Sequence, residues 1–159
     1  MMIKTTSLLG LSVIAISTLF FASSCKKSNS NSNNLSATIS GSGYSAAQVQ
    51  AADVYGVIGV VGMSISGKDT TGFAVQFDDT ATVGKKLDIN GLDMTEVSYQ
   101  SKTASYDSWF PSAHGTLTLS TYDKTGKRVA GTFSGTLYSS TGDSVVITNG
   151  SFNSSYLVP

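Results

Sequence analysis

An alternation of apolar and polar residues between Gly115 and Phe152 restricts the fold of this chain more than any other feature. In the first part of this segment, "GTLTLSTY", Leu117 and Leu119 alternate with threonines. Successive side chains of a β-strand point to opposite sides, so this pattern is typical of a strand with one buried face. The tetrapeptide "DKTG" then predicts a type I turn, with Gly126 at the position that needs a positive φ.

The residues after this turn predict two further strands of the same sheet. In "KRVAGTFSGTLY", Val129, Phe133 and Leu137 fall on one face, and "SSTGD" predicts a second turn before "SVVITNGSF". Short turns join antiparallel neighbours. We therefore expect the last third of the chain to form a three-stranded meander.

Strand patterns also dominate upstream of the meander. Phe73, Val75 and Phe77 alternate with smaller or polar residues. The glycine-punctuated stretch from Val54 to Ser66 predicts one long strand, because a helix there would carry three interior glycines at about 1 kcal/mol each. The type of structure at 44–49 stays open. Shorter strands are predicted at 37–39, 86–89 and 96–100.

The composition agrees with an all-β protein of one domain. Only 13% of the 159 residues are charged, and the formal net charge is zero. Without a basic surface field, we expect no nucleic-acid partner. For residues 35–159 we predict an all-β fold, an antiparallel β-sandwich of about eight strands, with a small, closed, lipocalin-like β-barrel as the alternative.

Residues 1–24 have the layout of a secretory signal peptide. Lys4 supplies a positive charge, and an apolar run extends from Leu8 to Ala22. A membrane-spanning helix needs about 20 apolar residues, whereas this run is shorter and contains serine and threonine. We therefore expect export followed by cleavage.

The single cysteine, Cys25, follows small residues in "ASSC", and this arrangement resembles the bacterial lipobox. The resemblance implies that Cys25 receives diacylglycerol and becomes the first residue of the mature protein, so that acyl chains anchor it to a membrane. Cleavage that leaves a free thiol and an uncleaved anchor are the alternatives. A lone unmodified cysteine in an exported protein would leave a reactive thiol, which favours lipidation.

Residues 25–34 combine this cysteine with "KKSNSNSNN", a polar tract that predicts a flexible tether. The tether lacks the acidic run that surface-exported lipoproteins of the Bacteroidota often carry. We therefore expect a lipid-anchored protein of the cell envelope, on the periplasmic face of the outer membrane rather than at the cell surface.

The segment 114–153 adds a second resemblance. Its Thr-Leu-Thr strand, followed by "GTFSGTL" and "ITNGSF", is similar to the C-terminal pattern of small Bacteroidota lipoproteins. The resemblance covers this segment and the leader. It strengthens the predictions of a β fold and an envelope location and implies no activity.

No catalytic or metal-binding motif is evident. His114 is the only histidine and Cys25 the only cysteine, so one chain cannot assemble a histidine-based triad or a Cys/His zinc cluster. The acidic residues lack the spacing of a calcium loop or of a glycosidase pair. They include Asp78, Asp79, Asp88, Asp93, Glu96 and Asp107. We expect a non-enzymatic protein with no cofactor and no metal.

One stretch, "SYDSWFPSAHG", has the composition of a binding loop. The rings of Tyr106, Trp109 and Phe110 could stack on sugars, which would make the domain a glycan-binding module. The competing expectation is stronger, because the only tryptophan of a small β domain usually belongs to the core.

Two further hypotheses concern a ligand and a modification. If the domain is a barrel, a cavity lined by Phe73, Phe77 and Phe133 would carry an apolar ligand.

The modification hypothesis concerns Asp-Thr and Asp-Ser pairs, which match the acceptor pattern of Bacteroidota O-glycosylation, although Asx turns have the same sequence. The acceptors would be Thr70, Thr80 and Ser144. The sequence thus predicts a non-catalytic binding or envelope-assembly component, with a glycan or an envelope protein as partner.

Overall fold

The computed structural model describes residues 33–90 and 94–159, which belong to one compact unit, Asn31–Pro159. The predicted signal peptide, Cys25 and most of the tether lie outside the described residues. No helix occurs within these two ranges, and so none that could cross a membrane. The described strands are β1 (Asn34–Ile39), β2 (Ser42–Ser45), β3 (Gln48–Val54), β4 (Val57–Ser66), β5 (Asp69–Asp78), β6 (Lys86–Asp88), β7 (Glu96–Gln100), β8 (Ser105–Asp107), β9 (His114–Asp123), β10 (Arg128–Tyr138) and β11 (Ser144–Ser155).

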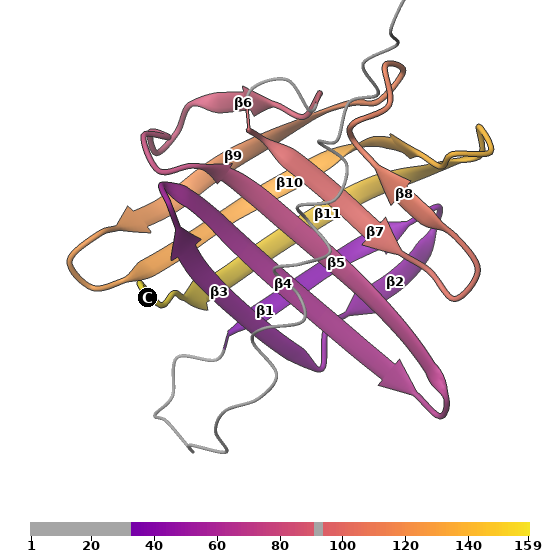
Figure 1. The fold of residues 1–159 in the computed structure, drawn as a ribbon, viewed down its shortest axis with the longest axis horizontal. Helices are drawn as coiled ribbons and strands as arrows, with labels where there is room; N and C mark the ends of the chain where they lie inside the picture. The colour runs from indigo at the N-terminus through magenta and orange to yellow at the C-terminus, as the bar shows by residue number, and fades with distance from the viewer. Residues whose placement is uncertain (1–32, 91–93) are drawn as a thin grey trace, which may run out of the picture. The chain divides into compact units, whose positions relative to one another are not determined.

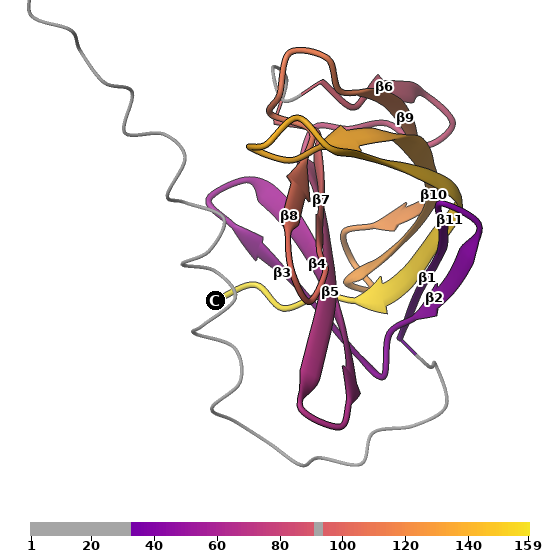
Figure 2. The ribbon, with the colours of Figure 1, turned by 90° about the vertical axis from the view of Figure 1, so that its right-hand side faces the viewer.

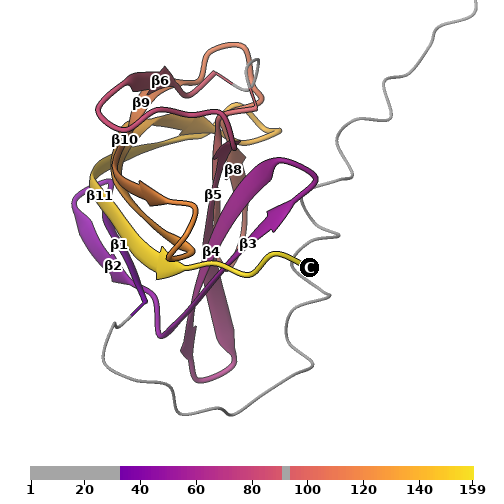
Figure 3. The same cartoon turned by 90° about the vertical axis from the view of Figure 1, so that its left-hand side faces the viewer.

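These strands form one antiparallel sheet that folds over into two layers. The hydrogen-bonded order is β2-β1-β11-β10-β8-β7-β5-β4-β3, with β9 beside β10 and β6 beside β9. The layer of β3, β4, β5, β7 and β8 faces the layer of β9, β10, β11, β1 and β2 (Figures 1, 2 and 3). Among the described strands, β2 and β3 end this order without pairing with each other, so the sheet does not close into a barrel. The prediction of an all-β antiparallel sandwich is confirmed.

The residues after β11 tie the two layers together. The backbone N–H of Leu157 donates to the carbonyl oxygen of Ala51 at 3.0 Å, and the carbonyl oxygen of Leu157 accepts from the N–H of Asp53 at 2.7 Å. These two bonds flank a single parallel bridge between Ala52 and Leu157. The edge of β3 is therefore held by the tail of the chain.

Aromatic rings fill the space between the layers. The ring centroid of Phe73 on β5 lies 5.7 Å from that of Phe133 on β10, and Phe77 lies 6.4 Å from Phe152 on β11. Ring pairs at such separations add about 0.5–1.5 kcal/mol beyond their burial. The three phenylalanines that the carrier hypothesis places around a cavity thus pack against other rings.

The predicted meander is confirmed as β9, β10 and β11, with Leu117, Leu119 and Val129 buried as the alternation requires.

The prediction for Gly126, in the turn between β9 and β10, is wrong, because the positive φ of this turn, 53°, belongs to Lys127. Gly126 is needed for a different reason. A Cβ atom there would meet the carboxylate of Asp123, which accepts hydrogen bonds from the backbone N–H groups of the turn.

The predicted single strand from Val54 to Ser66 is also wrong, because a hairpin turn interrupts it. Tyr55 and Gly56 form a two-residue loop between β3 and β4, with φ values of 53° and 82°. A type I′ turn requires a positive φ at both central residues, and its twist suits an antiparallel hairpin. The side chain of Asp53 accepts a hydrogen bond from the N–H of Gly56 at 3.2 Å. Because apolar residues lie on both sides of this turn, the sequence reads as one continuous strand.

The structure describes more strands than the eight predicted. The additional ones are β2, β3 and β8, and β2 and β8 are only four and three residues long. The first strand begins at Asn34, one residue before the predicted start of the domain. Short strands have too few residues to display an alternation, so pairing with neighbours defines them.

Candidate functional site

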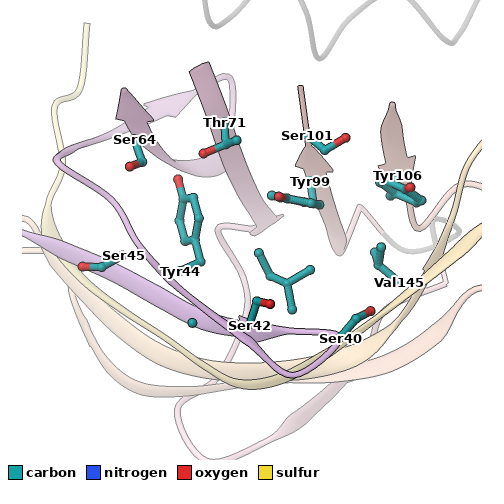
Figure 4. Close-up of a pocket in the computed structure, with 12 residues that line it drawn as sticks. Ser40, Ser42, Tyr44, Ser45, Ser64, Thr71, Tyr99, Ser101, Tyr106 and Val145 are labelled. Carbon is teal, nitrogen blue, oxygen red and sulfur yellow. The ribbon is translucent and has the colours of Figure 1, made fainter. Parts of the chain in front are cut away.

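A cleft opens between the layers where β2 faces β4, β5, β7 and β8 (Figure 4). We call it the tyrosine cleft, because Tyr44, Tyr99 and Tyr106 line it. Its volume is about 450 Å³, which lies within the range of small-molecule sites, about 300–1,000 Å³. The cleft is therefore large enough for a ligand of a few ring units.

The remaining polar lining of the tyrosine cleft consists of hydroxyl groups, and no charged side chain is among the described residues that line it. The hydroxyl-bearing residues besides the tyrosines are Ser40, Ser42, Ser45, Ser64, Thr71 and Ser101. Each hydroxyl can donate one hydrogen bond and accept two. The cleft thus offers many hydrogen-bonding groups without a net charge.

The three tyrosines form an aromatic group along the cleft. The rings of Tyr99 and Tyr106 stack with their centroids 6.1 Å apart, and Tyr44 stands edge-on to Tyr99 at 6.3 Å. The hydroxyl of Tyr44 donates a hydrogen bond to the carbonyl oxygen of Gly62 at 2.9 Å. Burial, and secondarily the neighbouring Tyr99, raises the pKa of Tyr44 to about 12, and burial also raises the pKa of Tyr99. Both hydroxyls therefore stay protonated at neutral pH.

Strand register places these tyrosines. Tyr99 lies directly opposite Tyr106 in the β7–β8 ladder and opposite Phe73 in the β5–β7 ladder. Opposite residues share a face, so all three rings point between the layers. Tyr44 is the one buried residue of β2, whose other three residues are exposed.

The structure separates the three aromatic residues that the sequence groups as ligand contacts. Tyr106 lines the tyrosine cleft, whereas Trp109 and Phe110 follow β8 in a turn and do not line it. The side chain of Trp109 is 47% exposed, so the expectation that it belongs to the core is wrong. In this turn Ser108 is fully buried, while the backbone N–H of Trp109 donates a hydrogen bond to the carboxylate of Asp107 at 2.9 Å.

The other predicted site residues are dispersed over the domain. Thr70, Thr80 and Ser144 are all exposed, as an O-glycosylation acceptor must be, and their modification stays a prediction. His114 is exposed at the first residue of β9. Cys25 lies outside the described residues.

Two carboxyl groups that look unrelated in the sequence come together in the fold. Asp107 of β8 pairs with Ser98, two residues beyond Glu96 on β7, and the two acids act on each other's pKa. Sequence reasoning missed this pair because it missed β8. At three residues, β8 is too short for an alternation in the sequence to reveal it. Within the described ranges, no three His, Cys, Asp or Glu side chains gather as a metal site would need.

Comparison of this chain with protein-family models, with curated proteins and with solved structures finds no match.

Proposed function

We propose that this protein is a lipid-anchored, extracytoplasmic binding protein without catalytic activity, and that its tyrosine cleft binds a neutral, hydroxyl-rich ligand, namely a glycan. One observation carries the proposal. A cleft of about 450 Å³ combines three tyrosine rings with six serine or threonine hydroxyls and, among its described lining residues, no charge.

The chemistry of a neutral sugar matches this lining. The C–H faces of a sugar ring pack on aromatic rings, and its hydroxyls exchange hydrogen bonds with protein hydroxyls. An acidic or phosphorylated ligand would instead call for lysine or arginine side chains, which bind such groups through charge-assisted hydrogen bonds. The composition of the cleft therefore favours an uncharged ligand.

The same lining supports binding without cleavage. Glycoside hydrolysis in most enzyme families needs two carboxyl groups on opposite sides of the scissile bond. The described lining of the tyrosine cleft contains no aspartate or glutamate. A glycan held there would meet neither a general acid nor a nucleophilic carboxylate.

The sequence supports the membrane anchor, through the signal peptide and the lipobox-like "ASSC" before Cys25. Mass spectrometry of the N-terminal peptide from the native host tests it. We expect a mature chain that begins at Cys25 and carries diacylglycerol and an additional acyl chain. An unmodified thiol, or a chain that retains the leader, would refute the anchor and leave the cleft unaffected.

A panel of neutral and acidic polysaccharides tests the binding proposal. We expect retention on one or more neutral glycans and none on acidic ones. Tyr99→Ala and Tyr106→Ala should each weaken binding about three- to tenfold, because each truncation removes an aromatic contact of about 0.5–1.5 kcal/mol. Tyr55→Ala is the matched control, because Tyr55 is fully exposed in the β3–β4 turn, away from the residues that line the cleft.

The rival hypotheses of the sequence have different signatures in the same assay. If Trp109 and Phe110 form the glycan site, Trp109→Ala abolishes binding while Tyr99→Ala leaves it intact. If the domain carries an apolar ligand, a fluorescent fatty-acid probe binds and no glycan does. Either result would replace the tyrosine cleft as the site.

A further inference from the structure

One end of the domain gathers exposed apolar side chains and lysines from two turns and the tail of the chain. We call it the Tyr55 end, and its members are Tyr55, Lys124, Lys127, Leu157 and Val158. Figure 3 views this end directly, with the β3–β4 turn, the β9–β10 turn and the tail on the same side of the domain. The N–H of Tyr156 donates to the carbonyl oxygen of Lys127 at 2.9 Å, which fastens the tail to the β9–β10 turn.

Tyr55 occupies a position of the β3–β4 turn that an aromatic residue fits poorly. Its φ is 53°, in the left-handed region that glycine, asparagine and aspartate tolerate better than bulky residues do. Packing against the described part of the domain does not offset this cost, because the side chain is fully exposed, at 102%. An unfavourable backbone conformation that no internal contact stabilises points to a contact outside the domain.

Leu157 and Val158 add two aliphatic side chains to this end. They are 68% and 53% exposed, although the two backbone hydrogen bonds between Leu157 and β3 hold the tail in place. A tyrosine ring beside aliphatic groups suits the interface of a lipid bilayer, where the ring lies at the level of the headgroups and its hydroxyl stays in contact with water. The Tyr55 end therefore has the apolar composition of a membrane contact.

The two lysines of the Tyr55 end are exposed and lie over tyrosine rings. The Nζ atom of Lys124 is 5.3 Å from the ring centroid of Tyr122, and that of Lys127 is 5.8 Å from the ring centroid of Tyr156. Long lysine side chains can cover apolar surface while their ammonium groups reach lipid phosphates. Lys124 also pairs with Asp79 at 3.5 Å, so we expect apolar contact rather than charge to dominate.

The chain enters the described domain near this end. Asn33, the first described residue, accepts a hydrogen bond through Oδ1 from the N–H of Ser155 at 3.1 Å, two residues before Leu157. The eight residues 26–33 can span at most about 28 Å, at about 3.5 Å per fully extended residue. A lipid on Cys25 would therefore keep Asn33 within about 28 Å of the bilayer surface.

The tyrosine cleft lies toward the opposite end of the same strands. β4 runs from Val57, directly after the β3–β4 turn, to Ser66, and its Ser64 lines the cleft. β11 likewise runs from the cleft, where Val145 lines it, toward the tail. A strand rises about 3.3 Å per residue, so roughly 25 Å or more separates the cleft from the Tyr55 end.

We propose that the Tyr55 end docks on the phospholipid surface of the membrane that carries the anchor, so that the tyrosine cleft opens away from the bilayer. Tyr55, Leu157 and Val158 enter the headgroup region, and the lysines contact lipid phosphates. Even weak contacts suffice for docking, because the anchor makes the second contact intramolecular. This inference rests on the proposed anchor at Cys25 and does not depend on glycan binding.

Fluorescence quenching on vesicles tests this orientation. Because Cys25 is the only cysteine and carries the lipid, an introduced cysteine is the only free thiol of the lipoprotein. Tyr55→Cys, Val158→Cys and Ser140→Cys are each labelled with a fluorophore, and the lipoprotein is reconstituted in vesicles of equal parts phosphatidylethanolamine and phosphatidylglycerol with spin-labelled headgroups. We expect strong quenching at Tyr55→Cys and Val158→Cys. Ser140→Cys, in the exposed β10–β11 turn, is the matched control and should be quenched little.

A second substitution measures what the Tyr55 ring contributes. Tyr55→Ala, introduced into the labelled Val158→Cys chain, should weaken docking about tenfold, as expected when a large apolar side chain no longer leaves water. Trp109→Ala removes another exposed ring, outside the Tyr55 end, and should leave the quenching unchanged.

Equal quenching at the three labelled positions, or no quenching at any of them, would overturn the proposal and leave the anchor intact. The second result is also the one expected if this end instead binds a protein, which pure lipid vesicles lack. Equal effects of Tyr55→Ala and Trp109→Ala would overturn it as well. A chain that does not float with the vesicles and retains a free thiol at Cys25 would refute the anchor, and the docking with it. Should Tyr55→Cys fail to fold, the comparison of Val158→Cys with Ser140→Cys still decides.

Discussion

Replacing Glu96 by glutamine should make the domain more stable at pH 8 and remove most of its pH dependence between pH 5 and 8. The glutamine keeps the shape of the side chain and the contact with Gln76, and its amide can donate to Asp107. It removes the charge that burial opposes. The native state holds a proton on Glu96 up to a pKa of about 7, whereas a glutamate in the unfolded chain loses it near 4.5.

The sign and size of the effect follow from proton linkage. Between these two pH values the folded protein binds more protons than the unfolded one, so the free energy of unfolding of the wild type falls as the pH rises. A tenfold change in an acid dissociation constant is worth about 1.4 kcal/mol, which sets an upper limit of about 3 kcal/mol for the whole shift. Residual solvation and the shared titration with Asp107 reduce the expected difference to about 1–2 kcal/mol.

Urea denaturation of the two proteins at pH 5, 6, 7 and 8 measures this difference. We expect the stability of the wild type to decrease across the series and that of Glu96→Gln to stay nearly constant. Asp88→Asn, which alters an exposed carboxylate, should decline in parallel with the wild type. Equal slopes for the wild type and Glu96→Gln would refute the reasoning that Glu96 is buried with an elevated pKa.

Two predictions concern backbone geometry and use the same denaturation assay. Gly150→Ala should destabilise the domain by about 1–3 kcal/mol, because its Cβ would lie 2.5 Å from the carbonyl oxygen and 2.6 Å from the ring of Phe133. Gly59→Ala is the matched control, since a Cβ there meets nothing within 4 Å, and it should be neutral or slightly stabilising. Equal losses for the two would contradict the close approach. Tyr55→Asn should stabilise the hairpin by about 0.5–1 kcal/mol, because asparagine tolerates the positive φ better than tyrosine does, and a loss of stability would contradict the assigned turn.

The fold class could be predicted from the sequence because the longest strands alternate apolar and polar residues, so the residues of the buried face can be identified. Phe73, Val75 and Phe77 alternate on β5, and Leu117 and Leu119 alternate on β9, so burial follows from a period of two alone. Turns rich in glycine and aspartate mark the ends of the meander. The loop between β3 and β4 lacks this composition, because its first residue is the aromatic Tyr55 and a valine lies on each side of the loop.

The candidate site could be predicted only in part, because it depends on pairing between strands. The sequence indicates Tyr106 as a ligand contact because of its ring, but its neighbours Tyr44 and Tyr99 come from β2 and β7, which meet only when the two layers form. Residue type alone predicts a core position for Trp109. Its exposure depends on the register of the three-residue β8, which no periodicity in so short a strand can reveal.

An NMR titration of the isotope-labelled protein with its best-bound neutral oligosaccharide tests the central claim most directly. The proposed function predicts that the resonances of Tyr44, Tyr99 and Tyr106 and of the serines around them shift together with one dissociation constant. The Trp109 indole signal, on the other face of the layer, should stay unchanged. Shifts centred on Trp109, or no shifts at any concentration of oligosaccharide, would contradict glycan binding in the tyrosine cleft.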